Sequence, residues 1–235
     1  MTFLRVKLQK IVRYVTFGVI FFSLAGISVD IIKYVFGHGW LWGFNALFQL
    51  DLEMTFPAYF QTAVLLINAG FMGLLSNRLR ILKKPDVTRW KILAWIFVYI
   101  ATDEILALHD RTIEPLRNAL HTGGVLYFSW VIYGSIVVAI IAAAYWPFLW
   151  RLPKNARRGI ILAGLLYVGG ALFMEMAGGV YSQRYGQETL VYNLCFVDVE
   201  ETLEMLGMLV FLRSLVLYWR ELGGSDIIQL TDPAS

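Results

Sequence analysis

Long apolar segments alternate with short polar connections along the whole chain. Six segments have the length and hydrophobicity of a membrane-spanning helix: residues 11–36, 57–77, 91–110, 125–149, 159–181 and 193–218. A hydrocarbon core of about 30 Å requires about 20 helical residues, and a helix satisfies its own backbone hydrogen bonds in lipid. The pattern predicts an all-α integral membrane protein, a six-helix transmembrane bundle that forms a single unit over residues 1–235.

Composition supports a membrane protein rather than a soluble domain. Hydrophobic residues make up 58% of the 235 residues and charged residues only 16%, whereas soluble domains carry about 25% charged residues. Cys195 is the one cysteine, so an intrachain disulfide is excluded. The sequence contains no phosphate-binding glycine loop. We therefore expect membrane lipids as partners, together with a membrane-protein partner if the chain serves a larger complex, and no nucleic acid.

Basic residues fix the expected orientation of the bundle. Sixteen of the 20 Lys and Arg residues lie near the two termini or in the connections 78–91 and 151–158. Because Lys and Arg accumulate on the cytoplasmic side of membrane proteins, we expect both termini to be cytoplasmic. An even number of spans agrees with this, since it returns the chain to the side where it started.

Acidic residues show the opposite distribution, and the orientation rule does not require it. Thirteen of the 17 Asp and Glu residues lie in outer loops or in the outer halves of the predicted spans. Ten of these thirteen lie in four stretches: QLDLEMTFP (49–57), ATDEILALHD (101–110), ALFMEMAGG (171–179) and VDVEETLEMLG (197–207). Since Asp and Glu contribute little to topology, a different reason must hold these acids at one depth.

Energetics predicts that these acids share an interior site. An ionised carboxylate near the centre of a bilayer costs at least about 2.5–3.5 kcal/mol, so lipid-facing positions are disfavoured. Glu201 and Glu204 are three residues apart and are therefore neighbours on one helix face. Shared protons, a water-filled cavity or a bound cation would each relieve the repulsion between the acids.

A divalent metal ion is the cation that we predict. Oxygen-rich sites suit Ca²⁺ or Mn²⁺, and carboxylates with histidine suit iron or manganese, so the expected ion is Fe, Mn, Zn or Ca. The predicted ligands are Asp103, His109, Glu175, Glu201 and Glu204. The predicted supporting residues are Asp51, Glu53, Glu104, Asp110 and Glu200.

Simpler interpretations of the same residues stay open. Asp51 and Glu53 could cap the second span, because negative charge favours a helix N-terminus. Glu104, Asp110 and Asp198 could be solvated at the membrane surface. The deeper acids could form a hydrogen-bond network without a ligand, with His109 as a structural histidine.

The motifs DEILALHD and VEETLEMLG resemble segments of a group of uncharacterised bacterial multipass membrane proteins. In this group an acidic DxE precedes the second helix, a DE…H[DE] helix follows, and a lone membrane Glu precedes an EExxEMxG helix. The order is the same in this chain, although Asp110 stands where Glu is more frequent. The resemblance implies a bacterial inner membrane and transfers no activity.

Three functions are compatible with the sequence. In the first, a metal site near the outer leaflet acts on a lipid or another hydrophobic substrate. In the second, the acids serve a cation or proton transporter component. In the third, the chain is a non-catalytic subunit or assembly factor of a membrane complex. Whether the protein is an enzyme therefore stays open at this stage.

Overall fold

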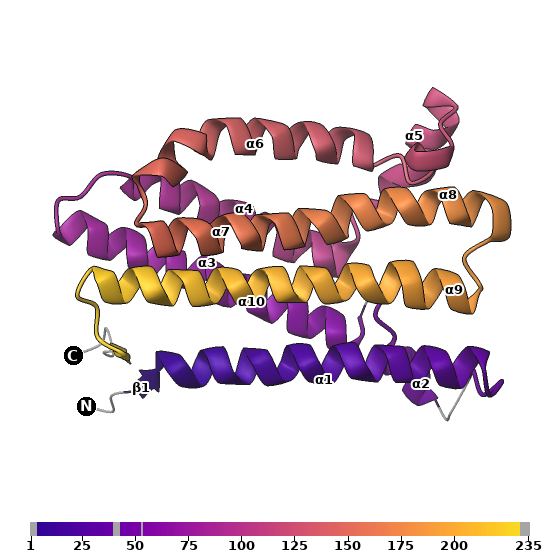
Figure 1. The fold of residues 1–235 in the computed structure, drawn as a ribbon, viewed down its shortest axis with the longest axis horizontal. Coiled ribbons are helices and arrows are strands. Elements are labelled where there is room, and N and C mark those ends of the chain that lie inside the picture. The colour runs from indigo at the N-terminus through magenta and orange to yellow at the C-terminus, as the bar shows by residue number, and fades with distance from the viewer. Residues whose placement is uncertain (1–3, 40–42, 53, 231–235) are drawn as a thin grey trace.

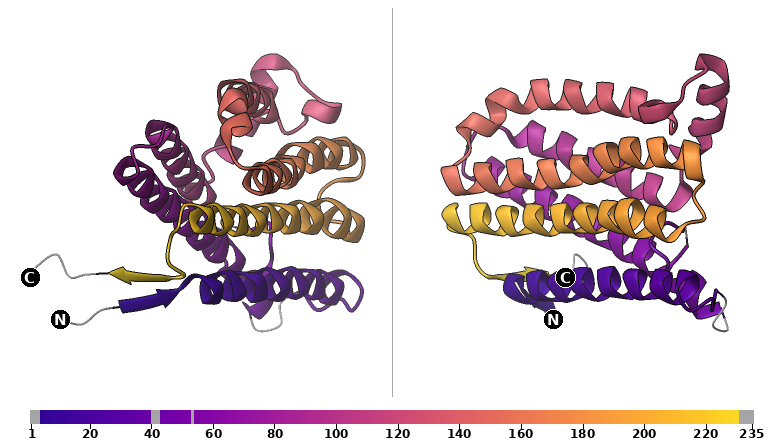
Figure 2. Two further views of the ribbon diagram at one scale, coloured as in Figure 1. Left: turned by 60° about the vertical axis from the view of Figure 1, so that its left-hand side comes forward. Right: turned by 45° about the vertical axis from the view of Figure 1, so that its right-hand side comes forward.

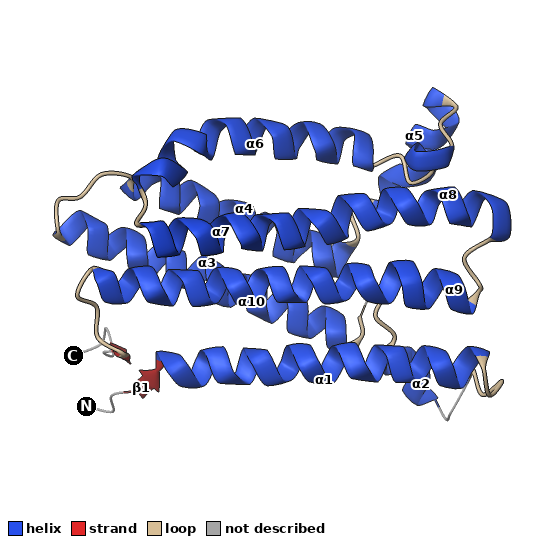
Figure 3. Ribbon diagram, viewed as in Figure 1, coloured by secondary structure: helices blue, strands red, loops and turns tan. Residues whose placement is uncertain are grey.

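A computed structural model describes residues 4–39, 43–52 and 54–230, and these residues are almost entirely helical (Figures 1 and 3). The elements in chain order are β1 (Leu4–Lys7), α1 (Leu8–Tyr34), α2 (Phe44–Phe48), α3 (Phe56–Ile81), α4 (Val87–Leu106), α5 (Asp110–Leu120), η2 (Gly124–Leu126), α6 (Val131–Arg151), α7 (Lys154–Val168), η3 (Gly169–Met174), α8 (Glu175–Tyr185), α9 (Leu190–Tyr192), η4 (Asn193–Val197), α10 (Asp198–Glu221) and β2 (Ile227–Leu230). The element η2 is a 3₁₀ turn, whereas η3 and η4 are π-helical.

The predicted all-α architecture is confirmed, and it contains five to six helices that are candidates for membrane spans. In the described part of the chain, five helical stretches are long and apolar enough to cross a bilayer: α1, α3, α6, Lys154–Tyr185 and Leu190–Glu221. Helices α4 and α5 meet the same criterion only when they are taken together, as a pair bent by 84°.

The third predicted span, 91–110, is wrong at its outer end. Helix α4 stops at Leu106 because Ala107 adopts the left-handed conformation, with φ 43° and ψ 52°. The carboxylate of Asp103 then accepts a hydrogen bond from the backbone N–H of His109 at 3.1 Å. These two features turn the chain sharply, so that α5 leaves the axis of α4.

The fourth predicted span, 125–149, begins six residues later than expected. Gly123 is extended and Gly124 has φ +62°, and the 3₁₀ turn η2 then occupies the start of the predicted segment. Helix α6 therefore starts at Val131.

Helix α10 is the central helix of the bundle. It packs against α7, α1 and α3, while α4 packs against α3 on the far side. Figures 1 and 2 show α1, α10, α7 and α6 stacked in that order, with α6 outermost. Helix α6 is mostly exposed along its length.

Glycines allow α10 to approach the fifth helical stretch closely. A Cβ added to Gly207 would lie 2.8 Å from the backbone nitrogen of Tyr167 and 2.9 Å from the carbonyl of Ala163. A Cβ added to Gly170 would lie 2.7 Å from the carbonyl of Glu200. Small residues at helix contacts are typical of membrane bundles because they let backbones come together.

The two ends of the bundle differ in character. At the terminal end, where the chain termini lie, β1 and β2 form a short antiparallel pair (Figure 2). Next to this pair lies an apolar core that includes Trp90, Phe148 and Tyr218. The acidic residues gather at the opposite end, which we call the pocket end.

Candidate functional site

A pocket of about 400 Å³ lies at the pocket end of the bundle. Eight carboxyl side chains line it: Asp51, Asp103, Glu104, Asp110, Glu114, Glu175, Glu200 and Glu201. The basic side chains in its wall are those of His109 and Arg117, and aromatic walls come from Tyr127, Phe128 and Tyr192. A volume in this range suits a small molecule or the polar part of a larger one.

Two π-helical turns precede the acids of the fifth and sixth stretches. The segment η3 ends at Met174, immediately before Glu175, and η4 ends at Val197, immediately before Asp198. A π-helical turn rotates the residues that follow it relative to a regular α-helix, and such turns are frequent at functional sites. They set which face of each helix carries the acids.

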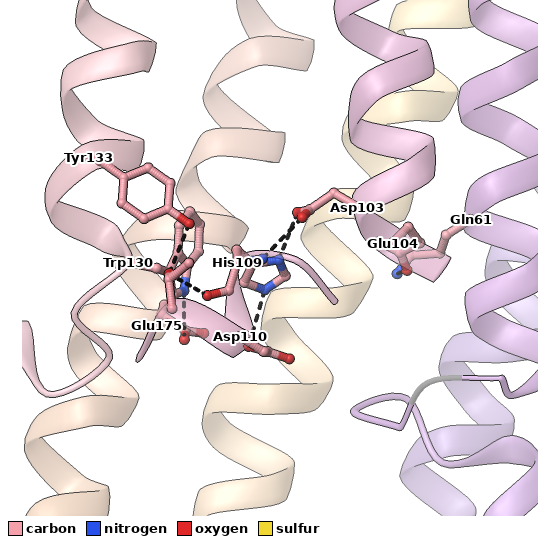
Figure 4. Close-up of polar contacts among 9 residues, drawn as sticks. Gln61, Asp103, Glu104, His109, Asp110, Trp130, Tyr133 and Glu175 are labelled. Atoms are coloured by element: carbon pink, nitrogen blue, oxygen red, sulfur yellow. Dashed lines mark hydrogen bonds and ion pairs between the residues drawn. The ribbon is translucent and has the colours of Figure 1, made fainter. Parts of the chain in front are cut away.

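His109 lies in the connection between α4 and α5 with a carboxylate on each ring nitrogen (Figure 4). Its Nδ1 is 2.7 Å from Asp103 Oδ2, and its Nε2 is 3.3 Å from Asp110 Oδ1. Both ring nitrogens therefore face carboxylate oxygens, and the ring is held between the two acids.

Gln61 joins two of the acids from a third helix. Its Nε2 donates to Glu104 Oε1 at 3.1 Å and also to Glu201 Oε2. The Gln61 side chain is 1% exposed, and its Oε1 has no hydrogen-bond partner among the described residues. Figure 4 shows Gln61 beside Glu104, at a distance from the His109 cluster.

Glu175 belongs to a separate group on the other side of the pocket. The indole Nε1 of Trp130 donates to Glu175 Oε1 at 3.0 Å, and the carboxyl of Glu200 is a hydrogen-bonding neighbour of Glu175. The Trp130 ring also lies 4.7 Å from the ring of His109, centroid to centroid. Trp130 thus connects the Glu175 group to the His109 group.

Glu204 lies beneath the pocket and does not line it. It is 9% exposed, and its side chain is hydrogen-bonded to Tyr167. Below it the interior is apolar, with Val64, Met205 and Met208 in the core. Glu204 therefore lies at the boundary between the polar pocket and the apolar core.

Asp51 lines the pocket from the loop before α3. The N-cap of α3 is Thr55, whose hydroxyl accepts from the backbone N–H of Ala58 at 3.3 Å, so the capping interpretation is wrong for Asp51. Although its side chain is open to the pocket, surrounding protein displaces bulk water. This loss of hydration, followed by the charges of Glu175 and Asp110, raises the pKa of Asp51 to about 7. Glu53 lies outside the described residues.

Asp198 is not solvated, contrary to the simpler interpretation. It is 2% exposed, and Asp30 on α1 is 1% exposed. The two carboxyl groups are close neighbours, and neither carboxylate oxygen of Asp198 has a hydrogen-bond partner among the described residues. The two acids form a buried carboxyl pair between α1 and α10, separate from the residues that line the pocket.

The structure therefore places the predicted site residues other than Glu53 and Glu204 around one pocket, in distinct groups. Asp103 contacts His109, Glu104 and Glu201 meet at Gln61, and Glu175 meets Glu200. Within residues 4–39, 43–52 and 54–230, no three His, Cys, Asp or Glu side chains are grouped closely enough to hold a metal ion. The predicted role of these residues as metal ligands stays a prediction.

Sequence reasoning missed Gln61 and Trp130. A lone amide within an apolar span is a signal for Gln61, because polar side chains in membrane helices need a partner. Nothing in the sequence marks Trp130, since its contact with Glu175 depends on the bend before α6.

Comparison with known proteins places the chain in a family without a known activity. The family described as "Domain of unknown function (DUF8692)" matches residues 43–219. The chain belongs to this family. The DUF8692 match runs from the residue before α2 to residue 219 in α10, and it contains all the residues that line the pocket. No curated protein and no solved structure matches the chain.

Proposed function

We propose that this DUF8692 protein spans a bacterial inner membrane six times, with both termini cytoplasmic and the pocket facing outward. Helix α4 crosses the membrane as the third span in this arrangement, and α5 bends away from it at the outer surface. Pairing of β1 with β2 holds both ends of the described chain at one end of the bundle. The excess of Lys and Arg on that side supports the orientation.

Cysteine labelling tests this topology. Single cysteines introduced into 78–91 or 151–158 should react only with reagent on the cytoplasmic side. Those introduced into 43–50 or 182–190 should react only from outside. The native Cys195 is exposed and is replaced by Ser in all variants. The reverse labelling pattern would place the pocket on the cytoplasmic side.

We further propose that the pocket binds a divalent cation and the polar end of a lipid or another hydrophobic molecule. The observation that carries this proposal is the charge of the pocket wall. Eight carboxyl groups face one small volume, and the basic side chains there are His109 and Arg117. Arg117 stacks over the ring of Tyr127 at 4.4 Å, so it is not committed to an acid. A bound cation would relieve the remaining repulsion.

Helix α5 supports a ligand that arrives from the membrane surface. It is strongly amphipathic, and none of its eleven residues is buried. Its bend of 84° from α4 suits a helix that lies in the interface with its apolar face in lipid. Ile113, Glu114 and Arg117 of this helix line the pocket. A lipid headgroup could then enter the pocket while its chains stay in the bilayer.

Transport is less well supported than binding at the outer face. Beneath Glu204 lies a core of Val64, Leu65, Met205, Met208 and Leu212. The amide of Asn68 in this region donates to the backbone carbonyls of Val64 and Met208. The described residues thus provide no chain of acids from the pocket to the terminal end.

Metal analysis of protein purified without chelators tests the proposal. We expect about one equivalent of Fe, Mn, Zn or Ca, or calorimetric binding of one of these ions to metal-free protein. Glu201→Gln should lose the ion, while Glu221→Gln, at the exposed end of α10, should keep it. Absence of metal together with absence of binding would reject the cation site, and native mass spectrometry would still report whether a lipid is held.

A further inference from the structure

The unusual contact of Gln61 identifies where the cation would sit. Gln61 lies in the first turns of α3 and is 1% exposed, and the two acids that its amide contacts, Glu104 and Glu201, both line the pocket. One nitrogen contacts a carboxylate from α4 and a carboxylate from α10. A positively polarised N–H₂ group between two carboxylates occupies the position that a cation would take.

The oxygen of the same amide supplies the second observation. Gln61 Oε1 is buried and without a hydrogen-bond partner among the described residues. Buried carbonyl oxygens are normally satisfied, so an unsatisfied one calls for an explanation. A half-turn about the last side-chain torsion exchanges the oxygen and nitrogen of the amide without changing its volume. The oxygen would then face the space between Glu104 and Glu201, and the N–H₂ group would take the buried position that the oxygen leaves.

We propose that Gln61, Glu104 and Glu201 form the seat of the divalent cation, with the Gln61 side-chain oxygen as a neutral third ligand. The assignment rests on the proposed cation-binding function and names its ligands. Two carboxylates balance the charge of a divalent ion, and amide and carboxylate oxygens are ligands that Ca²⁺ and Mn²⁺ accept. Remaining positions open toward the pocket for water or for an oxygen of the bound molecule.

His109 is excluded from this ligand set by its own contacts. A histidine ligand must offer a lone pair from a neutral ring, whereas both nitrogens of His109 face carboxylates. The resulting site contains oxygen ligands alone. Such a site favours Ca²⁺, Mg²⁺ or Mn²⁺ over Zn²⁺ or Cu²⁺.

Manganese binding to the full chain in lipid nanodiscs tests the assignment, because Mn²⁺ reports both affinity and ligand type by electron paramagnetic resonance. We expect one Mn²⁺ bound in the wild type, competed by Ca²⁺, without the nitrogen modulation of a coordinated imidazole. Gln61→Met, which keeps the length and removes the oxygen, should weaken binding by about tenfold or more. Gln61→Glu should retain binding, because a carboxylate oxygen replaces the amide oxygen.

Asn68→Leu is the matched control. Asn68 is a buried amide two turns along α3 that donates to backbone carbonyls, so its loss should leave Mn²⁺ affinity unchanged. Gel filtration and thermal melting establish folding of each variant. If Gln61→Met does not fold, the assignment is tested by the electron paramagnetic resonance spectrum of the wild type and by the Mn²⁺ affinity of Gln61→Glu.

The outcomes separate this assignment from the broader proposal. A wild type that binds none of these ions would reject both. Bound Mn²⁺ with imidazole nitrogen modulation would reject the assignment and retain the cation pocket. An Mn²⁺ affinity that Gln61→Met leaves unchanged would likewise reject the assignment and retain the cation pocket.

Discussion

The terminal end and the pocket end of the bundle treat acidic side chains in opposite ways. At the terminal end, the carboxylate of Asp86 meets Arg151 at 2.6 and 3.0 Å and Arg89 at 3.4 Å. At the pocket end, eight carboxyl groups face two basic side chains. Acidic side chains at the terminal end have arginine partners and stabilise the fold. Acidic side chains at the pocket end outnumber the basic side chains there and are available to bind a ligand.

Trp90→Ala should produce the largest effect and confine it to stability. The Trp90 ring is completely buried and packs against Phe148 and Tyr218, with centroid distances of 5.1 and 5.9 Å. Removing it should cost about 3–5 kcal/mol of unfolding free energy through the cavity it leaves. Chemical denaturation in detergent measures this loss. If the folded Trp90→Ala protein bound the cation more weakly, the two ends of the bundle would not be independent of one another.

Glu201→Gln should weaken cation binding without lowering stability. We expect cation affinity to fall by about 10–100-fold, with a thermal midpoint equal to or above that of the wild type, because a half-buried carboxylate without a basic partner among the described residues is removed. Calorimetry and thermal melting on the same sample distinguish the effects. A large loss of stability with unchanged affinity would assign Glu201 to architecture instead.

Gly170→Ala should affect both properties at once. A Cβ there would lie 2.7 Å from the carbonyl of Glu200 and 3.0 Å from Cγ of Glu204, so η3 and α10 must separate. We expect a loss of about 1–3 kcal/mol and weaker cation binding. Gly164→Ala on α7 is the control, because nothing lies within 4 Å of its added Cβ. Equal stability of the two variants would refute the close approach.

The pH dependence of the metal-free protein should show the smallest effect. The pKa of Asp51 in the folded protein is about 7, above the ordinary value of 3.8. A carboxyl group with a raised folded pKa stabilises the fold fully below about pH 4, and this contribution is lost as the pH rises through about 7. The thermal midpoint of Asp51→Asn should therefore decrease less than that of the wild type between these values. Identical curves would show that Asp51 does not titrate in this range.

Hydropathy predicted the helical architecture because lipid imposes a length and an apolar composition on every span. The gathering of Asp103, Glu175 and Glu201 at one pocket also follows from sequence, since their common depth and the cost of lipid exposure leave few other positions. That reasoning locates a pocket, and it does not pair the acids within it.

The pairing within the pocket depends on backbone features that the sequence does not mark. Ala107 takes a left-handed conformation, which favours glycine or asparagine. Hydrogen bonds between Asp103 and His109, on either side of Ala107, hold the backbone in this conformation. Neither η3 nor η4 contains a residue type that predicts a π-helical turn. Each of these features rotates or bends a helix, and so each changes which acid meets which partner.

The antiparallel pair of β1 and β2 has a consequence for the order of assembly. Helix α1 packs mainly against α10, and the strand before α1 pairs with the strand after α10. Helix α1 therefore acquires its main neighbour only after α10 is synthesised. Contacts between distant parts of a chain form slowly because a long loop must close. The packing of α1 is consequently completed late, once α10 has been made.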